Sequence, residues 1–92
     1  MASVLIQGGS RGLGLQFCKT LASRSEVSQI VVTSRKAQDE LSLLKVKNVY
    51  PEKISLVNLD VRREVGIKDK LALISKIVNG KLDLLINCSA IL

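Results

Sequence analysis

The regular alternation of apolar runs with helix-type patterns is the feature that most constrains how this chain can fold. Four runs rich in aliphatic and β-branched residues begin roughly 25–30 residues apart, which is the length of a strand–helix unit with its connections. The runs show little alternation between apolar and polar residues, which is typical of strands buried on both faces of a parallel sheet. The predicted strands span residues 4–6, 30–33, 54–59 and 82–88.

Amphipathic helices are predicted between these strands. Apolar residues recur there at three- and four-residue spacing, which places them on one face of a helix. Pro51 ends the second helical segment, and Asn79-Gly80 ends the third, because glycine accepts the left-handed conformation common at helix ends. The residues of the apolar faces are Leu13, Phe17 and Leu21 in the first helix, Ala37, Leu41 and Leu44 in the second, and Ile67, Leu71, Ile74 and Val78 in the third.

This element order predicts one α/β domain built on an open parallel sheet. The pattern β-α-β-α-β-α-β fills the 92 residues without a linker or a low-complexity segment. Parallel strands joined through helices form right-handed crossovers in nearly all proteins. Because single domains typically have about 100–150 residues, we expect residues 1–92 to form one partial domain.

The residue composition excludes several kinds of chemistry. The chain has no histidine, so histidine-dependent catalysis and histidine-ligated metals are excluded. Its two cysteines, Cys18 and Cys88, are too few for a zinc site, and no metal ligands are predicted. The start of the chain lacks the basic and apolar regions of a signal peptide, so we expect buried, reduced thiols in a cytoplasmic protein. A single disulfide between the two cysteines is the alternative.

The positive charge of the chain does not by itself indicate nucleic-acid binding. Fourteen Lys and Arg residues against eight Asp and Glu residues give a net charge of +6. The basic residues are scattered, and the only aromatic residues, Phe17 and Tyr50, are too few for a base-stacking platform. A mildly cationic surface instead favours an anionic small molecule. No membrane span is expected, because polar residues interrupt the longest apolar stretch, 82–92.

A glycine-rich loop follows the first predicted strand and opens the first helix. Residues 7–14, with the sequence QGGSRGLG, have the pattern G-x-x-x-G-x-G. Glycines allow a sharp turn and a close approach of the backbone to a pyrophosphate, and the helix N-terminus offers that anion unpaired N–H groups and a positive dipole. A P-loop is excluded because no Gly-Lys-Ser/Thr follows. The alternative is that the glycines only shape a tight strand-to-helix turn.

This loop resembles the T-G-x-x-x-G-x-G motif of the short-chain dehydrogenases/reductases. Gly8, Gly12 and Gly14 match the three glycines, whereas Gln7 stands where threonine is usual. In order and spacing, all 92 residues resemble the first four strands of this family's Rossmann-like domain. The resemblance implies an open parallel sheet with strand order 3-2-1-4, truncated before strands five to seven. Within the family, the chain is most similar to carbonyl-reductase-like and C-factor-like members.

Two further segments resemble elements of the same family. Asp60-Val61, after the third strand, is similar to the family's D-V, whose acidic residue contacts the adenine ring. Residues 87–90, with the sequence NCSA, are similar to the N-N-A-G at the end of the fourth strand, although only Asn87 matches strictly.

The end of the second strand decides which dinucleotide such a site accepts. A carboxylate there binds the ribose 2′-hydroxyl of NAD and repels a 2′-phosphate. Ser34 is small and neutral, Arg35 follows it, and Arg11 lies where NADP-preferring members often place a second base. This pattern predicts NADP(H) in preference to NAD(H). The alternative is that these arginines are ordinary surface charges. The cofactor-binding residues that the resemblance implies are Gly8, Ser10, Arg11, Gly12, Leu13, Gly14, Ser34, Arg35, Asp60, Val61, Asn87, Ser89 and Ala90.

The catalytic residues of the family are not found in this chain. In the family, a tyrosine and a lysine four residues later move the proton, and a serine orients the substrate. The only tyrosine, Tyr50, is followed four residues later by Ile54, and we interpret it as a packing residue at a helix end. Asp60 and Asp83 lie on different strands, and no serine has a histidine base. No catalytic residue is therefore predicted.

We interpret the chain as the NADP(H)-binding part of a cytoplasmic NADPH-dependent carbonyl reductase, inactive by itself. A carbonyl or alcohol substrate would bind only to a longer parent protein. The alternative is a non-catalytic nucleotide-binding or interaction module, and a basic nucleic-acid binder is the least favoured hypothesis. A serine and a Tyr-x-x-x-Lys downstream in the parent gene would indicate an enzyme, and a genuine stop would indicate a binding remnant.

The fourth predicted strand would be an edge of the sheet in this chain. It carries Leu84, Leu85 and Ile86 in succession, with no proline or lysine and one acidic residue, Asp83. Natural sheet edges usually carry residues that block pairing with another chain. We therefore expect self-association through this strand.

Overall fold

The computed structural model describes residues 2–8, 12–59 and 67–87, and these residues form the expected alternation of strands and helices. The third helix begins at Ile67, whose side chain lies outside the description. The strands are β1 (Ala2–Gln7), β2 (Val27–Ser34), β3 (Ile54–Asn58) and β4 (Leu84–Asn87); the helices are α1 (Gly12–Ala22), α2 (Leu41–Val49) and α3 (Ile67–Ile77), with a short 3-10 helix η1 (Ala37–Asp39) before α2.

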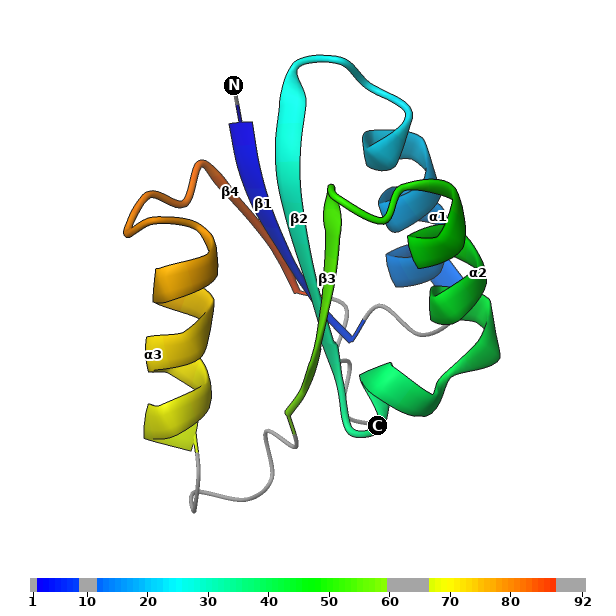
Figure 1. The fold of residues 1–92 in the computed structure, drawn as a ribbon. Coiled ribbons are helices and arrows are strands. Elements are labelled where there is room, and N and C mark those ends of the chain that lie inside the picture. Colours follow the sequence, from blue (N-terminus) through cyan, green and yellow to red (C-terminus); the bar gives the residue numbers. More distant parts are fainter. Residues whose placement is uncertain (1, 9–11, 60–66, 88–92) are drawn as a thin grey trace.

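The four strands form one parallel sheet in the order β3-β2-β1-β4, which confirms the predicted strand order 3-2-1-4. Helices α1 and α2 cover one face of the sheet, and α3 covers the other (Figure 1). The first two crossovers therefore move outward from β1, and the third returns to the opposite side of β1. In open α/β sheets, ligands bind outside the carboxyl ends of the strands at the point where the strand order reverses. Here that point lies between β1 and β4.

The core has two layers of aliphatic side chains, one on each face of the sheet. Ile6, Val32 and Leu56 form a cross-strand row in the larger layer, beneath α1 and α2. Val31 belongs to the smaller layer with Ile74 of α3. Both faces of β2 are buried, which explains why apolar and polar residues do not alternate in its sequence. Burial of each of these side chains contributes about 1.5–3 kcal/mol.

Helix α1 packs against the sheet through a face other than the predicted one. Leu13 and Phe17 are 73% and 41% exposed, whereas Gly14, Cys18 and Ala22 are buried. The buried row is shifted by one residue, or about 100° around the helix, from the predicted row. The buried residues are small, and small residues let the helix approach the sheet closely. The predicted apolar face of this helix is therefore wrong for its first two positions.

The second helical segment is also divided differently from the prediction. Ala37 is buried in η1, but the chain then leaves helical geometry at Glu40 before α2 begins. Because of this break, the apolar face of α2 does not continue from Ala37. Leu43 and Val46 face the core, and Leu41 is 73% exposed. The single helix predicted from three apolar positions is therefore wrong.

The end of α3 confirms the predicted stop at residues 79–80. Asn79 and Gly80 have φ values of 59° and 72°, in the left-handed region. The Gly80 N–H donates to the Ser75 carbonyl at 2.7 Å, and the Asn79 N–H donates to the Lys76 carbonyl at 3.2 Å. These two bonds form a Schellman motif, which satisfies carbonyls that the helix end would otherwise leave unpaired. Ile74 and Val78 are buried as predicted, while Leu71 is exposed.

Strand β4 is an edge among the described residues, because it pairs with β1 alone. Leu84 and Leu85 are 44% and 55% exposed. Asp83 fixes the start of the strand: its carboxylate accepts the Ser3 N–H at 2.8 Å, and its own N–H donates to the Ser3 carbonyl at 2.9 Å. The edge position expected from the sequence is confirmed for residues 84–87, and Cys88 lies outside the described residues.

Candidate functional site

The carboxyl ends of the four strands lie side by side at one end of the sheet, which we call the carboxyl edge. In register, Ser34 at the end of β2 pairs with Asn58 at the end of β3. Gln7 at the end of β1 pairs with Thr33 on one side and with Asn87 on the other. All four strands run toward this edge, which is the lower end of the sheet in Figure 1. Ser34 and Asn87, two predicted site residues on separate strands, therefore lie at the same end of the sheet.

The turn from β1 into α1 depends on glycine at two described positions. Gly8 has a φ of 79°, and its N–H donates to the Thr33 carbonyl at 2.7 Å, which holds the turn against β2. Gly12 has a φ of 63°, and a Cβ placed there would meet no atom of the described, non-adjacent residues within 4 Å. The left-handed backbone favours glycine at both positions. Among the described residues, no neighbouring strand excludes a side chain at Gly12.

The N-terminus of α1 points toward this edge and keeps its positive character. No acidic residue lies in the first turn of α1, so no side-chain charge opposes the helix dipole there. Gly14 is buried, as its role in bringing the helix close to the sheet requires, and Leu13 is exposed beside it. Ser10 and Arg11, both predicted to contact the cofactor, lie outside the described residues.

The end of β2 presents a neutral residue followed by a cationic one. The Ser34 carbonyl accepts the Leu59 N–H at 2.8 Å, which links the ends of β2 and β3. The Ser34 Oγ is buried and has no hydrogen-bond partner among the described residues. Arg35 is exposed, and its side chain makes no hydrogen bond or ion pair within residues 2–8, 12–59 and 67–87. The exposed guanidinium is thus available to an anionic ligand, whereas the hydroxyl is buried.

Gln38 and Asn58 together shape the end of β3, which no motif in the sequence predicts. The Asn58 Oδ1 accepts the backbone N–H of Gln38 at 2.9 Å, and the Gln38 Nε2 donates to the Leu56 carbonyl at 3.3 Å. These bonds hold η1 against the end of β3. An asparagine near the end of the predicted strand 54–59 is the only local signal for them, since the partner lies 20 residues away.

Of the remaining residues predicted to contact the cofactor, one is described by the structure and four are not. Asn87 ends β4 and is exposed at the switch point between β1 and β4. Asp60, Val61, Ser89 and Ala90 lie outside the described residues, so their placement stays a prediction.

Two other residues considered in the sequence have structural roles. Tyr50 caps α2, donates its backbone N–H to the Val46 carbonyl at 3.0 Å and packs against the larger core layer. Cys18 is a free, buried thiol, and burial raises its pKa from 9.0 to about 11, with the Lys19 charge opposing that shift. A protonated thiol in the core is not a nucleophile at neutral pH.

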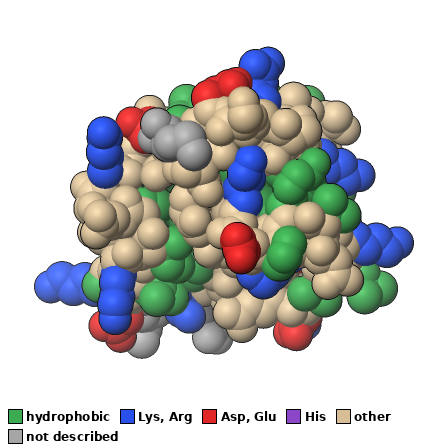
Figure 2. All heavy atoms as spheres, turned by 45° about the horizontal axis from the view of Figure 1, so that its top comes forward, with side chains coloured by type: hydrophobic (Ala, Val, Ile, Leu, Met, Phe, Trp, Pro, Cys, Tyr) green, Lys and Arg blue, Asp and Glu red, His purple; other side chains and the backbone are tan. Residues whose placement is uncertain are grey.

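No metal-ligand cluster and no membrane-spanning helix is found in the part of the chain that the structure describes. Those residues contain no group of three metal-ligating side chains, and none of their helices has the length and apolar character needed to span a bilayer. Basic side chains are scattered over the face seen in Figure 2 rather than gathered in one patch. The arrangement best suits a small anion with several hydrogen-bonding groups at the carboxyl edge of the sheet.

Comparisons with known proteins agree with this arrangement. The family model for short chain dehydrogenases matches residues 2–92. Salutaridine reductase from Papaver bracteatum is 33% identical over 88 residues, which cover 95% of this chain and 28% of that protein. The structure of the carbonyl reductase Sniffer of D. melanogaster is similar with a TM-score of 0.86 at 26% identity, over 99% of this chain and 37% of that one.

A further solved structure shows the same fold. A carbonyl reductase from Pseudomonas aeruginosa PAO1, in complex with NADP, has a TM-score of 0.82 at 24% identity, over 99% of this chain and 39% of that one. The chain spans less than a third of the curated relatives it matches, 28% and 26% of their lengths.

Proposed function

Because the chain belongs to the short-chain dehydrogenase family, whose members bind nicotinamide dinucleotides, we propose that its strand ends bind NADP(H) in preference to NAD(H). One observation carries the preference. The end of β2 holds the small, neutral Ser34 and the adjacent exposed Arg35 guanidinium, where NAD-preferring sites carry a carboxylate. A 2′-phosphate would meet a cation there, with no acid at residue 34 or 35 to repel it. The carbonyl reductase from Pseudomonas aeruginosa, which shares the fold, was solved with NADP.

In this proposal, different residues at the carboxyl edge of the sheet bind different parts of the cofactor. The N-terminal N–H groups of α1 face the pyrophosphate, and Gly12 leaves the space that a phosphate needs. Arg35 would form a paired, charge-assisted contact with the 2′-phosphate, and the small Ser34 would leave room for that group. The nicotinamide, when bound, supplies hydride transfer. Asp60 stays proposed as the contact to adenine.

The reduction of a carbonyl belongs in this proposal to a longer protein that contains the chain. Salutaridine reductase and the carbonyl reductases are each more than twice as long as the matched segment. Tyr50 is committed to packing and is followed by Ile54 rather than lysine at the fourth position, so residues 1–92 contain no Tyr-x-x-x-Lys. The chain alone therefore binds the cofactor without turning over a carbonyl. The buried free thiol of Cys18 supports a cytoplasmic location.

Titration calorimetry with NADPH and NADH tests the preference. NADPH should bind more tightly, and Arg35→Ala should reduce the difference by about 1–3 kcal/mol, because one charge-assisted phosphate contact is lost. Arg24→Ala is the matched control: Arg24 lies at the opposite end of the sheet, paired with Glu26 at 3.1 Å, and its loss should leave the difference unchanged. Equal affinity for the two cofactors in the unmutated chain would contradict the proposal.

Gly12→Ala separates a turn-forming glycine from a ligand-binding one. The substitution should cost about 1–2 kcal/mol of unfolding free energy, since alanine is strained in the left-handed region. Gly80→Ala should cost a similar amount, because Gly80 has a φ of 72° and equally open surroundings at the other end of the sheet. Only Gly12→Ala should weaken NADPH binding as well. Equal NADPH affinities in the two variants, measured alongside chemical unfolding, would show that Gly12 serves the turn alone.

A further inference from the structure

A groove of about 300 Å³ lies between α1 and α2, in the helical layer over the sheet. Its volume is at the lower end of the range for small-molecule sites. The described residues that line it come from both helices and the end of α2: Lys19, Lys45, Val46, Val49 and Tyr50.

One side of the groove is apolar and fixed in place. Val46 is 6% exposed and belongs to the core, so it cannot move away from the groove. The Tyr50 ring is held by its core contacts, with the Lys53 Nζ 5.9 Å from the ring centroid. Val49, beside them, is 68% exposed. A ligand with an apolar tail would remove this surface from water, which is favourable in proportion to the apolar area buried.

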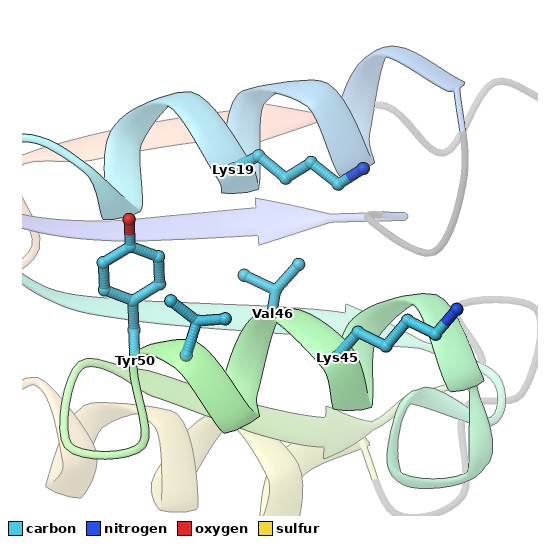
Figure 3. A pocket seen from close by; sticks show the side chains of 5 residues that line it. Lys19, Lys45, Val46 and Tyr50 are labelled. Atoms are coloured by element: carbon cyan, nitrogen blue, oxygen red, sulfur yellow. The ribbon is translucent and has the colours of Figure 1, made fainter.

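Two lysine side chains, one from α1 and one from α2, line the same groove. Lys19 and Lys45 extend along it toward the same end, away from the Tyr50 ring (Figure 3). Neither side chain makes a hydrogen bond or an ion pair with any described residue. Two nearby lysines behave differently: the Lys47 Nζ donates to the Ile54 carbonyl at 2.8 Å, and the Lys53 Nζ donates to the Ala22 carbonyl at 3.0 Å. The cations of the groove are therefore available to a ligand, and its described lining has no carboxylate to compete.

We propose that this groove binds a small amphiphilic carboxylate, with the apolar tail against Val46, Val49 and Tyr50 and the carboxylate at Lys19 and Lys45. The charged head would lie at the end of the groove with the two ammonium groups, and the apolar tail at the end with the Tyr50 ring. The small volume suits one compact molecule rather than a peptide helix or a membrane surface. The site lies on the sides of α1 and α2 and does not depend on the proposed cofactor binding.

Calorimetric titration with decanoate, kept below its micelle-forming concentration, tests the proposal on the unmutated chain and on Lys19→Met/Lys45→Met. Methionine preserves the apolar stem and removes the charge, so the double variant should bind decanoate about tenfold more weakly. Lys76→Met, on α3 across the sheet, is the charge-matched control and should change the affinity less than twofold. Decanol should bind at least as weakly to the unmutated chain as decanoate binds to the double variant.

Each of the following results would overturn the site. The first is equal weakening of decanoate binding by Lys76→Met and by the double variant, which would indicate a general charge effect. The second is full decanoate affinity in Val49→Asp, whose circular dichroism confirms folding, because the apolar wall would then be irrelevant. The third is binding of vesicles with anionic lipids without binding of free decanoate, which would indicate a membrane surface. Saturating NADPH should leave decanoate affinity within twofold, and displacement by NADPH would place decanoate in the cofactor site instead.

Discussion

Gly14→Val should abolish NADPH binding and lower the free energy of unfolding by about 1–3 kcal/mol, the usual cost of overpacking. Gly14 is buried in the row Gly14, Cys18 and Ala22, which faces the sheet. A β-branched side chain there would push the first turn of α1 outward. Because that turn carries the N–H groups that we propose bind the pyrophosphate, the displacement should remove binding as well as stability.

Gln16→Val provides the matched control for this substitution. Gln16 lies on the exposed side of the same helix, and its side chain donates a 3.4 Å hydrogen bond to Thr20. Valine there has the same low helix propensity without entering the packed face. Chemical unfolding and calorimetry on both variants give the comparison. A folded Gly14→Val chain that binds NADPH as the unmutated chain does would show that the glycine is not needed for binding.

Residues 1–92 should self-associate through β4, and Leu85→Lys should make the chain monomeric. Leu84 and Leu85 are half-exposed on a strand with one neighbour among the described residues. The nearby charge, Asp83, is engaged with the Ser3 N–H and does not protect the edge. A lysine on an edge strand is a common obstacle to pairing with another chain.

Sedimentation velocity over a series of protein concentrations measures this effect. Leu41→Lys is the control, because Leu41 is 73% exposed on α2 and lies away from β4. It adds the same charge and removes the same apolar side chain, yet should leave self-association intact. An unmutated chain that stays monomeric throughout, unfolds cooperatively and binds no hydrophobic dye would contradict the expectation, and so would a Leu41→Lys chain as monomeric as Leu85→Lys.

The sheet could be predicted from the sequence because strand spacing and continuous apolar character are local properties. The segment 30–33 is unbroken by polar residues, except for Thr33, which is itself 1% exposed in the structure. The helix faces could not be predicted in the same way. The pattern at Leu13 and Phe17 is as regular as the one at Gly14 and Cys18, and only the distance between helix and sheet favours the small residues.

The candidate site could be predicted in part for a related reason. Parallel strands end at one edge, so the sequence could indicate that Gly8, Ser34 and Asn87 lie along it. The sequence could not show that the Ser34 hydroxyl is buried without a partner among the described residues, or that Asn58 accepts a hydrogen bond from Gln38. Those facts depend on how a 3-10 turn sits against a neighbouring strand, which no short pattern in the chain records.

The most direct test of the central claim is a residue-by-residue map of backbone amide shifts during titration with NADPH. If the carboxyl edge of the sheet is the binding site, the amides of Gly8, Gly12 and Ser34 should shift together and saturate at one concentration. The amides of Gly80 and Asp83, at the opposite edge, should remain in place. Shifts confined to that opposite edge, or no saturable shifts at all, would contradict the assignment of this chain as a dinucleotide-binding domain.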